Sequence, residues 1–571
     1  MSITNFFPAY RRPNLLDVLG DWRTPRLAAI AAIHLAALYG VLTTEHGAFG
    51  VSAALLCWGL LNFFWLVLLC RPGVSAALSL AILVGVIVLS RFKFDVTWMT
   101  INFLDLLIID ADTIAFLLTI FPQLRPTVIV VAVLAVPLLF LLWRLDPFRI
   151  RRRSALLGGA LCLAGIVGLS MAVPEHPSEP FQGVNHLSGF ARSGVVSGSQ
   201  LISRGGWLES ESTFGDRLTP ALAETCRPAG KTPHIVMVLD ESSFDISAVP
   251  GVKVPADYRR HFDSFDGKSR SFVAEVTGGQ TWHTEYNVLT GLSARSFGQM
   301  KFYVTRIAAG HVERGLPQAL RRCGYRTFSL YPAYGAFLSA RKFQTGTGVG
   351  RLIDSTEMGA GDVEPDRFYY DQAARLIERE RGAAPLFLFV YTVANHYPWE
   401  SRFRPDLTPA WRDPGNGSEV DEYIRRQTMS AHDYADFVAR LQREFPDESF
   451  LLVRFGDHQP SFAARMLEPA RDDVTVAEGI RQFDPRYYTT YYALDPINFT
   501  PVDLSSALDR LDAPYLPLAV LGAAGIPLDP SFAEQKQILD RCRGLFYRCR
   551  NGAEARRLNK LLIDAGLIKG L

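Results

Sequence analysis

The sequence predicts two structural parts: a multi-span α-helical membrane domain, and after it an exported α/β domain with a largely parallel sheet. Two observations predict this division. Long uncharged apolar stretches fill residues 1–174, and from residue 233 short apolar runs alternate with amphipathic stretches. At 571 residues the chain also exceeds what one hydrophobic core usually holds. We therefore expect a membrane domain at 1–174, a linker at 175–232 and a globular domain at 233–571.

Five apolar stretches in the first part are each near the roughly 20 residues that a helix needs to cross about 30 Å of hydrocarbon. They are Arg26 to Thr43, Val51 to Cys70, Val74 to Ser90, Thr127 to Trp143 and Ala155 to Val173. A further apolar segment, Trp98 to Phe121, contains Asp105, Asp110 and Asp112. Because three carboxylates in lipid would be costly, we interpret it as a re-entrant or interfacial helix pair, with a sixth span as the alternative.

Basic residues predict the orientation of these spans. With five spans, one side of the membrane carries Arg11, Arg12, Arg23, Arg26, Arg71, Arg144, Arg149, Arg151, Arg152 and Arg153. Only Arg91 and Lys93 fall on the other side. The positive-inside rule makes the arginine-rich side cytoplasmic, so everything after about Pro174 is expected outside the cytoplasm.

Cysteine content and net charge add two expectations. The exported part has four cysteines, Cys226, Cys323, Cys542 and Cys549, and an even number outside the cytoplasm allows disulfides. Cys542 and Cys549 could close a small loop, and free buried thiols are the alternative. The net charge of +2, with no concentrated basic face outside the cytoplasmic loops, predicts that no nucleic acid is a partner.

After the membrane domain, the composition and the hydrophobic pattern of the chain change near residue 233. Residues 175–232 are rich in Pro, Gly and Ser, which is typical of a linker lying along the membrane. From His234 onward, apolar runs such as "HIVMVLD", "PLFLFVYTVANH" and "SFLLVRFGDH" alternate with helix-like stretches such as "FYYDQAARLIERER". This alternation predicts a largely parallel sheet covered on both faces. In such sheets ligands bind beyond the carboxyl ends of the strands.

Acidic residues and a histidine follow two of these predicted strands. The first run ends in Asp240 and Glu241, and the run ending "FGDHQ" places Asp457 and His458 at the same edge. Asp, Glu and His are the usual oxygen and nitrogen ligands of divalent metals, so the set is a candidate metal site. An acid after a strand is more often a helix N-cap, and capping is the competing interpretation.

The stretch "TGGQTWHTEYNVLTG" adds a candidate nucleophile, Thr281, before a helix expected from Trp282. Glycines allow a tight turn, and a helix start offers free N–H groups to a phosphate. A threonine hydroxyl is a poor nucleophile unless a base or a metal lowers its pKa. A metal that touches Thr281 would explain the neighbouring acids and histidine, and a plain N-cap is again the alternative.

Two residues of the same stretch allow either a functional or an ordinary role. His283 could donate a hydrogen bond to a phosphate, or it could lie exposed in a surface loop. Glu285 could support the metal ligands, or it could face solvent on its helix.

The ordered set of five spans, "LDES", "GGQTWHTE", "NHYPW" and "GDHQ" resembles the lipoteichoic acid synthases and the phosphoglycerol transferases of periplasmic glucans. These belong to the alkaline phosphatase and sulfatase superfamily. The resemblance implies a bacterial inner-membrane, multi-pass protein whose residues 233–571 form a sulfatase-like catalytic domain on the periplasmic or extracellular side. It also implies that Glu241, Thr281, Asp457 and His458 bind one divalent cation, Mn²⁺ or Mg²⁺, with Thr281 as the nucleophile.

Two further residues gain roles from this resemblance. His396, in "ANHYPW", matches a catalytic and substrate-binding histidine that contacts the transferred group, and Arg341, in "SARKFQTGTG", matches an arginine that holds phosphate. Relatives often have a His-Gly-type element and a tryptophan near the second of these motifs. Here the corresponding stretch is "YPAYGAFLSARKF", so the head-group pocket departs from the family pattern.

The resemblance implies a metal-dependent phosphoglycerol transferase, moving a head group from phosphatidylglycerol to a glycan hydroxyl through a phospho-threonine intermediate. Sulfatases need a Cys or Ser in a Cys/Ser-x-Pro-x-Arg context, which Thr281 to Glu285 lacks. Lipid A phosphoethanolamine transferases carry many paired cysteines in their soluble domain, and four are too few for that subgroup. A phosphoethanolamine transferase of another kind, a metal-dependent hydrolase and a non-catalytic binding module remain as alternatives.

Overall fold

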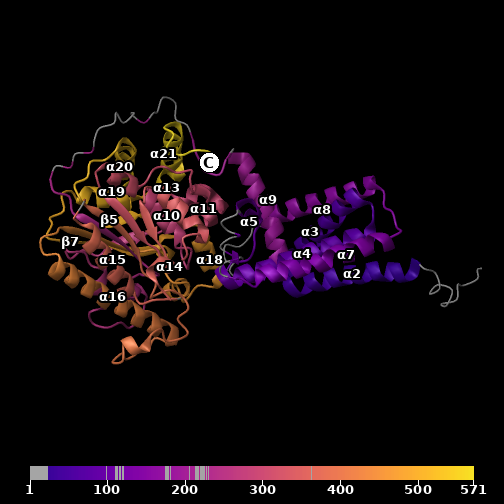
Figure 1. Cartoon of the computed structure of the whole chain (residues 1–571), viewed down its shortest axis with the longest axis horizontal. Coiled ribbons are helices and arrows are strands. Elements are labelled where there is room, and N and C mark those ends of the chain that lie inside the picture. Colours follow the sequence, from indigo (N-terminus) through magenta and orange to yellow (C-terminus); the bar gives the residue numbers. More distant parts are fainter. Residues whose placement is uncertain are drawn as a thin grey trace, which may run out of the picture. The chain divides into compact units, whose positions relative to one another are not determined.

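The chain forms two compact units, of which the first ends at Ser199 and the second runs from Gln200 to Leu571, with the short stretch 110–116. The computed structural model describes residues 23–97, 99–109, 121–173, 182–204, 206–211, 230–361, 363–382 and 384–571, together with residues 114, 117, 118, 179, 218, 226 and 228. Figure 1 shows the helices of the first unit in indigo to magenta and the mixed unit in later colours.

Five helices of the first unit are long and apolar enough to cross a membrane. They are α2 (Arg23–Thr44), α3 (Gly47–Leu69), α4 (Pro72–Thr97), α7 (Leu124–Leu145) and α8 (Arg152–Ala172). Each contains most or all of one predicted span, so the multi-span helical domain is confirmed. None of the described side chains of α7 is buried, and an apolar helix exposed on all sides suits lipid rather than water.

The acidic segment between α4 and α7 is only partly described. It contains the short helix α5 (Phe103–Ile108), in which the Asp105 carboxylate pairs with Lys93 Nζ at 2.8 Å. The same carboxylate accepts a hydrogen bond from the Asn102 backbone N–H, which completes a capping box. Asp105 is thus satisfied by local partners. Trp98, Asp110 and Asp112 lie outside the described residues, so the helix pair expected there stays a prediction.

The segment expected to be a linker contains a regular helix, α9 (His186–Arg204). The backbone N–H groups of Leu187 and Ser188 in its first turn donate to the buried Glu45 carboxylate at the end of α2. A Cβ atom on Gly194 would lie 3.2 Å from the Phe103 ring, so this glycine allows close packing, whereas in the sequence alone Ser and Gly favour a linker.

The second unit is built on one eight-stranded sheet in the order β4-β3-β5-β1-β6-β7-β2-β8. The strands are β1 (His234–Asp240), β2 (Arg270–Val273), β3 (Arg326–Leu330), β4 (Arg351–Ile353), β5 (Leu386–Tyr391), β6 (Phe450–Gly456), β7 (Thr489–Ile497) and β8 (Arg510–Asp512). The five strands from β4 to β6 are parallel, and only β7 runs antiparallel to its neighbours. The predicted largely parallel sheet is confirmed.

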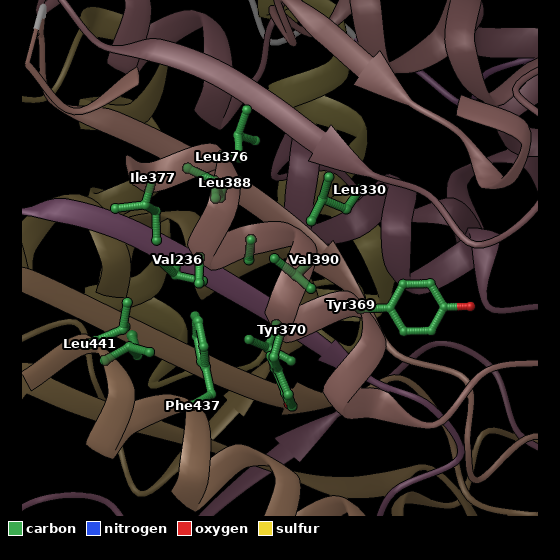
Figure 2. Packing of buried hydrophobic residues seen from close by; sticks show 14 of the residues in the cluster. Val236, Leu330, Tyr369, Tyr370, Leu376, Ile377, Leu388, Val390, Phe437 and Leu441 are labelled. Carbon is green, nitrogen blue, oxygen red and sulfur yellow. The ribbon is translucent and has the colours of Figure 1, made fainter. Parts of the chain in front are cut away.

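Two long helices, α15 (Asp366–Glu380) and α16 (Ser418–Glu444), bury one face of this sheet. Figure 2 shows Val236 of β1 and Val390 of β5 beside Tyr370 and Phe437, whose rings stack with centroids 4.8 Å apart. Figure 1 shows α10 (Trp282–Thr290), α19 (Leu516–Ala523) and α20 (Pro530–Cys542) on the other side of the strands. Since both faces are covered, the central strands are buried along their whole length.

All four cysteines of the second unit form disulfides, Cys226–Cys323 and Cys542–Cys549. The second closes the small loop expected from the sequence. Both lie in the unit predicted to be outside the cytoplasm, where such bonds persist.

Candidate active site

The pairing of the two central strands places the candidate metal ligands beside each other. Asp240 at the end of β1 is opposite Gly456 at the end of β6, so the next residues, Glu241 and Asp457, leave the sheet side by side. A Cβ atom on Gly456 would lie 1.8 Å from the Ser243 carbonyl oxygen. Glycine is therefore required there, because it lets the chain after β1 pass close to the end of β6.

Three side chains converge beyond these strand ends. One ligand atom from each of Glu241, Asp457 and His458 lies within 4.8 Å of the other two, and all three residues are buried. His458 Nε2 lies 3.2 Å from Asp457 Oδ2 and 3.6 Å from Glu241 Oε1. Two carboxylates and an imidazole at this spacing form a set that suits a divalent cation.

Hydrogen bonds outside the cluster leave the inner atoms of Asp457 and His458 free, whereas Glu241 Oε1 accepts a hydrogen bond from Ser242 Oγ at 2.7 Å. Asp457 Oδ1 accepts from the backbone N–H groups of Ser242, at 2.7 Å, and His458, at 2.9 Å, whereas its Oδ2 is buried with no hydrogen-bond partner among the described residues. His458 Nδ1 lies 3.0 Å from the Gln459 carbonyl oxygen and is placed to donate to it. That tautomer leaves the lone pair of Nε2 free for a metal, so these residues fit the implied cation.

The electrostatics of the cluster also favour a bound cation. Burial and the neighbouring Asp457 carboxylate raise the pKa of Glu241, and burial raises the pKa of Asp457 to about 7. Burial also lowers the pKa of His458. Ionised carboxylates are thus unfavourable in this enclosed place unless a positive charge lies between them.

The predicted nucleophile lies at the edge of the same cluster. Gly278, Gly279 and Gln280 all have positive φ and form a turn. The Gly278 N–H donates a 2.9 Å hydrogen bond to the carbonyl oxygen of Gln459, the residue after His458. This turn leads into α10 at Thr281, whose Oγ1 lies 3.4 Å from Glu241 Oε2. The structure therefore brings together all four residues predicted to bind the metal.

His396 follows β5, the other neighbour of β1, and its side chain is exposed. Its Nδ1 lies 2.6 Å from the Tyr397 carbonyl oxygen. Burial and the Asp457 charge raise the pKa of Glu241, and the charge of His396 acts in the opposite direction. A histidine at the open side of the site can reach a bound substrate.

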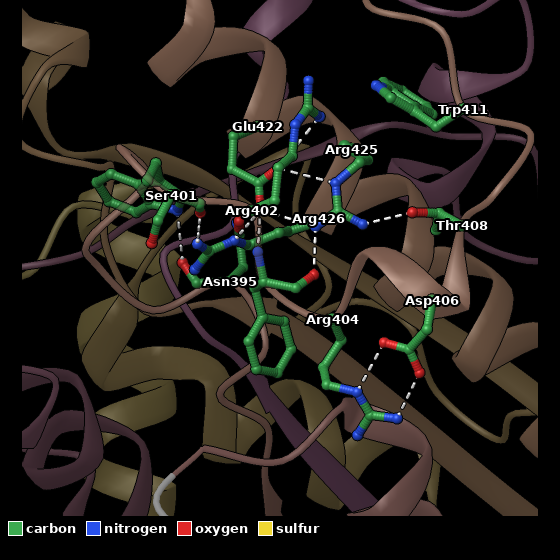
Figure 3. A network of polar contacts seen from close by, with 12 residues as sticks. Asn395, Ser401, Arg402, Arg404, Asp406, Thr408, Trp411, Glu422, Arg425 and Arg426 are labelled. Carbon is green, nitrogen blue, oxygen red and sulfur yellow. Dashed lines mark hydrogen bonds and ion pairs between the residues drawn. The ribbon is translucent and has the colours of Figure 1, made fainter.

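A buried ionic network fixes the backbone of the loop that carries His396. Arg426 of α16 donates to the carbonyl oxygens of His396 at 2.9 Å, Pro398 at 2.8 Å and Ser401 at 2.9 Å. Its Nε pairs at 2.7 Å with Glu422, which also binds the neighbouring arginine of α16, as Figure 3 shows. Arg426 was not among the residues predicted from the sequence, although an acid with a base four residues later on a helix is a recognisable ion-pair spacing.

Arg341, the predicted phosphate ligand, is held by acids instead. It lies on α13 (Ala340–Gly346), and its guanidinium pairs with Asp354 at 2.8 Å and Glu357 at 2.9 Å and donates to the Leu352 carbonyl oxygen. Arg341 makes no ion pair or hydrogen bond with Glu241, Thr281, Asp457 or His458, all of which lie in the part of the chain that the structure describes. A role in holding phosphate stays a prediction.

Two side chains of α10, His283 and Glu285, are buried, although the sequence allowed both to be exposed to solvent. The interpretation of His283 as an exposed loop residue and that of Glu285 as a solvent-facing helix residue are therefore both wrong. The reason is that α10 is covered on every side by the rest of the unit. Glu285 accepts a hydrogen bond from Gln344 Nε2 at 2.8 Å, and burial raises its pKa to about 7.

Residues 236–482 match the family model described as Sulfatase. This stretch carries the strand ends, the threonine loop and all the predicted site residues. The second unit therefore contains a stretch that matches the sulfatase family model, in agreement with the resemblance of its motifs.

Curated proteins and solved structures give further similarities. The chain is 28% identical over 281 residues to the capsular polysaccharide biosynthesis protein RkpI of Rhizobium meliloti (strain 1021), covering 45% of this chain and 48% of that protein. It is 22% identical over 220 residues to an uncharacterised Haemophilus influenzae protein, covering 36% of this chain and 39% of that one. The chain thus matches about half the length of these curated relatives, or less.

Among solved structures, the chain is similar to the Streptococcus pyogenes phosphoglycerol transferase GacH in complex with sn-glycerol-1-phosphate. The TM-score is 0.47 at 14% identity, covering 61% of this chain and 89% of that one. It is also similar to the integral membrane lipooligosaccharide phosphoethanolamine transferase EptA of Neisseria meningitidis. In that case the TM-score is 0.41 at 13% identity, covering 87% of this chain and 95% of the other.

Proposed function

We propose that this protein is a metal-dependent phosphoglycerol transferase of the bacterial inner membrane, with its sulfatase-family domain on the periplasmic or extracellular side. It moves the head group of phosphatidylglycerol to a glycan hydroxyl through a phospho-threonine intermediate. The observation that carries the proposal is the convergence of Thr281 with Glu241, Asp457 and His458, with Thr281 Oγ1 3.4 Å from Glu241 Oε2.

The first half of the proposed reaction forms the covalent intermediate. Thr281 Oγ attacks the phosphorus of the donor, and Glu241 Oε2 is placed to accept the hydroxyl proton. The bond between phosphorus and the diacylglycerol oxygen breaks, and His396 at the open side donates a proton to that oxygen. The products are diacylglycerol and a phosphoglycerol group on Thr281.

The second half returns the enzyme to its starting state. A glycan hydroxyl attacks the phosphorus and His396 takes the proton of that hydroxyl. The bond from phosphorus to Thr281 Oγ breaks, and Glu241 returns its proton to Oγ. A bound divalent cation, Mn²⁺ or Mg²⁺, would lower the pKa of the threonine hydroxyl and screen the charge on the phosphoryl oxygens. Glu241, Asp457, His458 and Thr281 would hold it.

Membrane attachment suits the proposed donor. A phospholipid is confined to the bilayer, and five helices of this chain are able to cross one. An enzyme attached to the same membrane meets its donor without extracting the lipid into water.

The test is diacylglycerol release by the purified full-length protein in detergent, with phosphatidylglycerol, Mn²⁺ and a glycan acceptor. We expect release that depends on both metal and acceptor, together with phosphoglycerol bound to the glycan. Free glycerol phosphate formed at the same rate with or without acceptor would identify a hydrolase instead. Faster turnover of phosphatidylethanolamine than of phosphatidylglycerol would identify a phosphoethanolamine transferase.

A further inference from the structure

Two basic side chains lie together on one aromatic surface beside α10. Arg295 and Lys301 belong to the irregular helix η4 (Ala294–Tyr303) and are both partly exposed. The Arg295 guanidinium carbon lies 3.7 Å from the centroid of the Phe483 ring, and Lys301 Nζ lies 4.4 Å from the same centroid. The guanidinium also lies 4.5 Å from the Tyr547 ring centroid. Two cationic groups thus lie against the same Phe483 ring.

The positive charge of this pair is not balanced by an ion pair. Among the described residues neither side chain has a carboxylate within 4.0 Å, and Arg295 Nε is buried without a hydrogen-bond partner. Two acids act on the pair from beyond ion-pair distance. The Glu275 carboxylate accepts a hydrogen bond from the Arg295 backbone N–H at 3.4 Å, and burial raises the pKa of Asp512 to about 7, which weakens its charge near neutral pH. Burial and then the Arg295 charge lower the pKa of Lys301 to about 8. Such a pair is stabilised when an anion binds.

The pair is attached to the helix that begins at Thr281. Trp282 Nε1 donates to the Phe302 carbonyl oxygen at 2.8 Å, which ties the segment next to Lys301 to the first turn of α10. His283 has its ring centroid 5.9 Å from that of Phe302, and neither of its buried ring nitrogens has a hydrogen-bond partner of normal geometry among the described residues. Burial holds the pKa of His283 well below its ordinary value, so this residue links the two segments as a neutral ring and adds no charge to the pair.

We propose that Arg295 and Lys301 form an anion-binding subsite, distinct from the metal cluster, for a phosphate or carboxylate group of the acceptor. The assignment to the acceptor rests on the proposed function. In that reaction the donor phosphate is bound at Thr281, and its glycerol head group has no charge that needs a second pair of cations. A ligand with a planar or tetrahedral anionic group suits an arginine fork beside a lysine point charge.

Binding can be tested without turnover, by measuring how fast an amine-acylating reagent modifies Lys301 in the full-length protein after EDTA treatment. The probes are inorganic phosphate, glucose 6-phosphate, glucuronate and glucose, with peptide mass spectrometry as the readout. We expect the three anions to slow modification of Lys301 at least threefold and glucose to leave it unchanged. The exposed Lys342 is the internal control and should be modified equally throughout.

Two variants distinguish failure of the anion subsite from failure of the proposed reaction at Thr281. Thr281→Ala should keep the protection of Lys301, whereas Arg295→Gln should abolish it. Equal modification of Lys301 with and without anions in the wild-type protein would overturn the subsite. Protection by inorganic phosphate alone, without protection by glucose 6-phosphate or glucuronate, would overturn its assignment to an acceptor.

A kinetic comparison tests the role in the reaction. Lys301→Met should raise KM for an anionic glycan acceptor at least tenfold and leave KM for a neutral acceptor within twofold. Lys301→Arg, which keeps the charge, should stay within threefold of wild type for both. Equal changes in KM for the two acceptors in Lys301→Met would contradict the inference, and the thermal midpoint of each variant shows that it is folded.

Discussion

The Thr281 hydroxyl lies 3.4 Å from Oε2 of Glu241, although the two residues are 40 positions apart in the chain. Glu241 directly follows the buried strand β1, and Thr281 directly precedes the buried helix α10. Both ends are fixed by regular structure, so the contact does not depend on a loose loop. A candidate nucleophile and a candidate metal ligand are therefore held ready for the same phosphorus atom.

Replacement of the nucleophile should abolish turnover without unfolding the protein. We expect Thr281→Ala to reduce diacylglycerol release by about 1,000-fold or more, because the change removes the attacking hydroxyl. Thr356→Ala, on the exposed surface of the same unit, is the matched control and should keep wild-type activity. Turnover in Thr281→Ala within tenfold of wild type would exclude a covalent role for the threonine.

Removal of one carboxylate should remove the metal. We expect Asp457→Asn to lower the bound divalent cation, measured by elemental mass spectrometry, from about one per chain to near zero, because its free Oδ2 is a predicted ligand. EDTA should inactivate the wild-type protein reversibly, with activity restored by Mn²⁺ or Mg²⁺. Asp509→Asn, at an exposed acid, should retain the metal. Full metal content in Asp457→Asn would refute the ligand set.

The central strands and the grouping of the candidate metal ligands could be predicted from the sequence for the same reason. Apolar runs that end in acids mark buried parallel strands, and parallel strands bring their carboxyl ends to one edge, so the order of residues alone groups Glu241, Asp457 and His458. Thr281 could be added because a glycine turn in front of a helix is a local signal.

Other parts of the site could not be predicted, because they depend on contacts between distant segments. Arg426 and His396 are 30 residues apart, and only packing of α16 shows that one holds the backbone of the other. Lys301 and Phe483 are likewise joined only by the fold. The helix α9 was missed because small polar residues favour both linkers and close helix packing.

Arg426, which binds the backbone of the loop around His396, should affect the turnover rate by positioning that histidine. We expect Arg426→Gln to lower turnover about tenfold, because three carbonyl oxygens of the loop lose their donor. In a His396→Ala background the same change should have little further effect. Arg425→Gln removes a neighbouring partner of Glu422 that does not contact the His396 carbonyl, so it is the control. Additive losses in the double variant would contradict this positioning role.

The buried Asp366 should make stability depend on pH. Burial and then the nearby Asp240 carboxylate raise its pKa from an ordinary value of 3.8 to about 7. The native state then keeps a proton that the unfolded state releases, so stability should fall as pH rises from about 4 to about 7.

Asp366→Asn should remove this part of the slope, since the amide oxygen can still accept the N–H groups of Val393 and Ala394. The measurement is the thermal midpoint between pH 4 and pH 8. Asp371→Asn, an exposed acid on the same helix, should keep the wild-type slope. Identical slopes for wild type and Asp366→Asn would show that burial does not hold the proton on this carboxyl group.

The covalent intermediate is the most direct test of the central claim. The full-length protein, loaded with Mn²⁺, is incubated with phosphatidylglycerol in the absence of acceptor, quenched in acid and analysed by peptide mass spectrometry. The account predicts a phosphoglycerol adduct on Thr281 that disappears when a glycan acceptor is added before quenching. An adduct on another residue, or diacylglycerol release with no adduct on Thr281 at any time point, would contradict it.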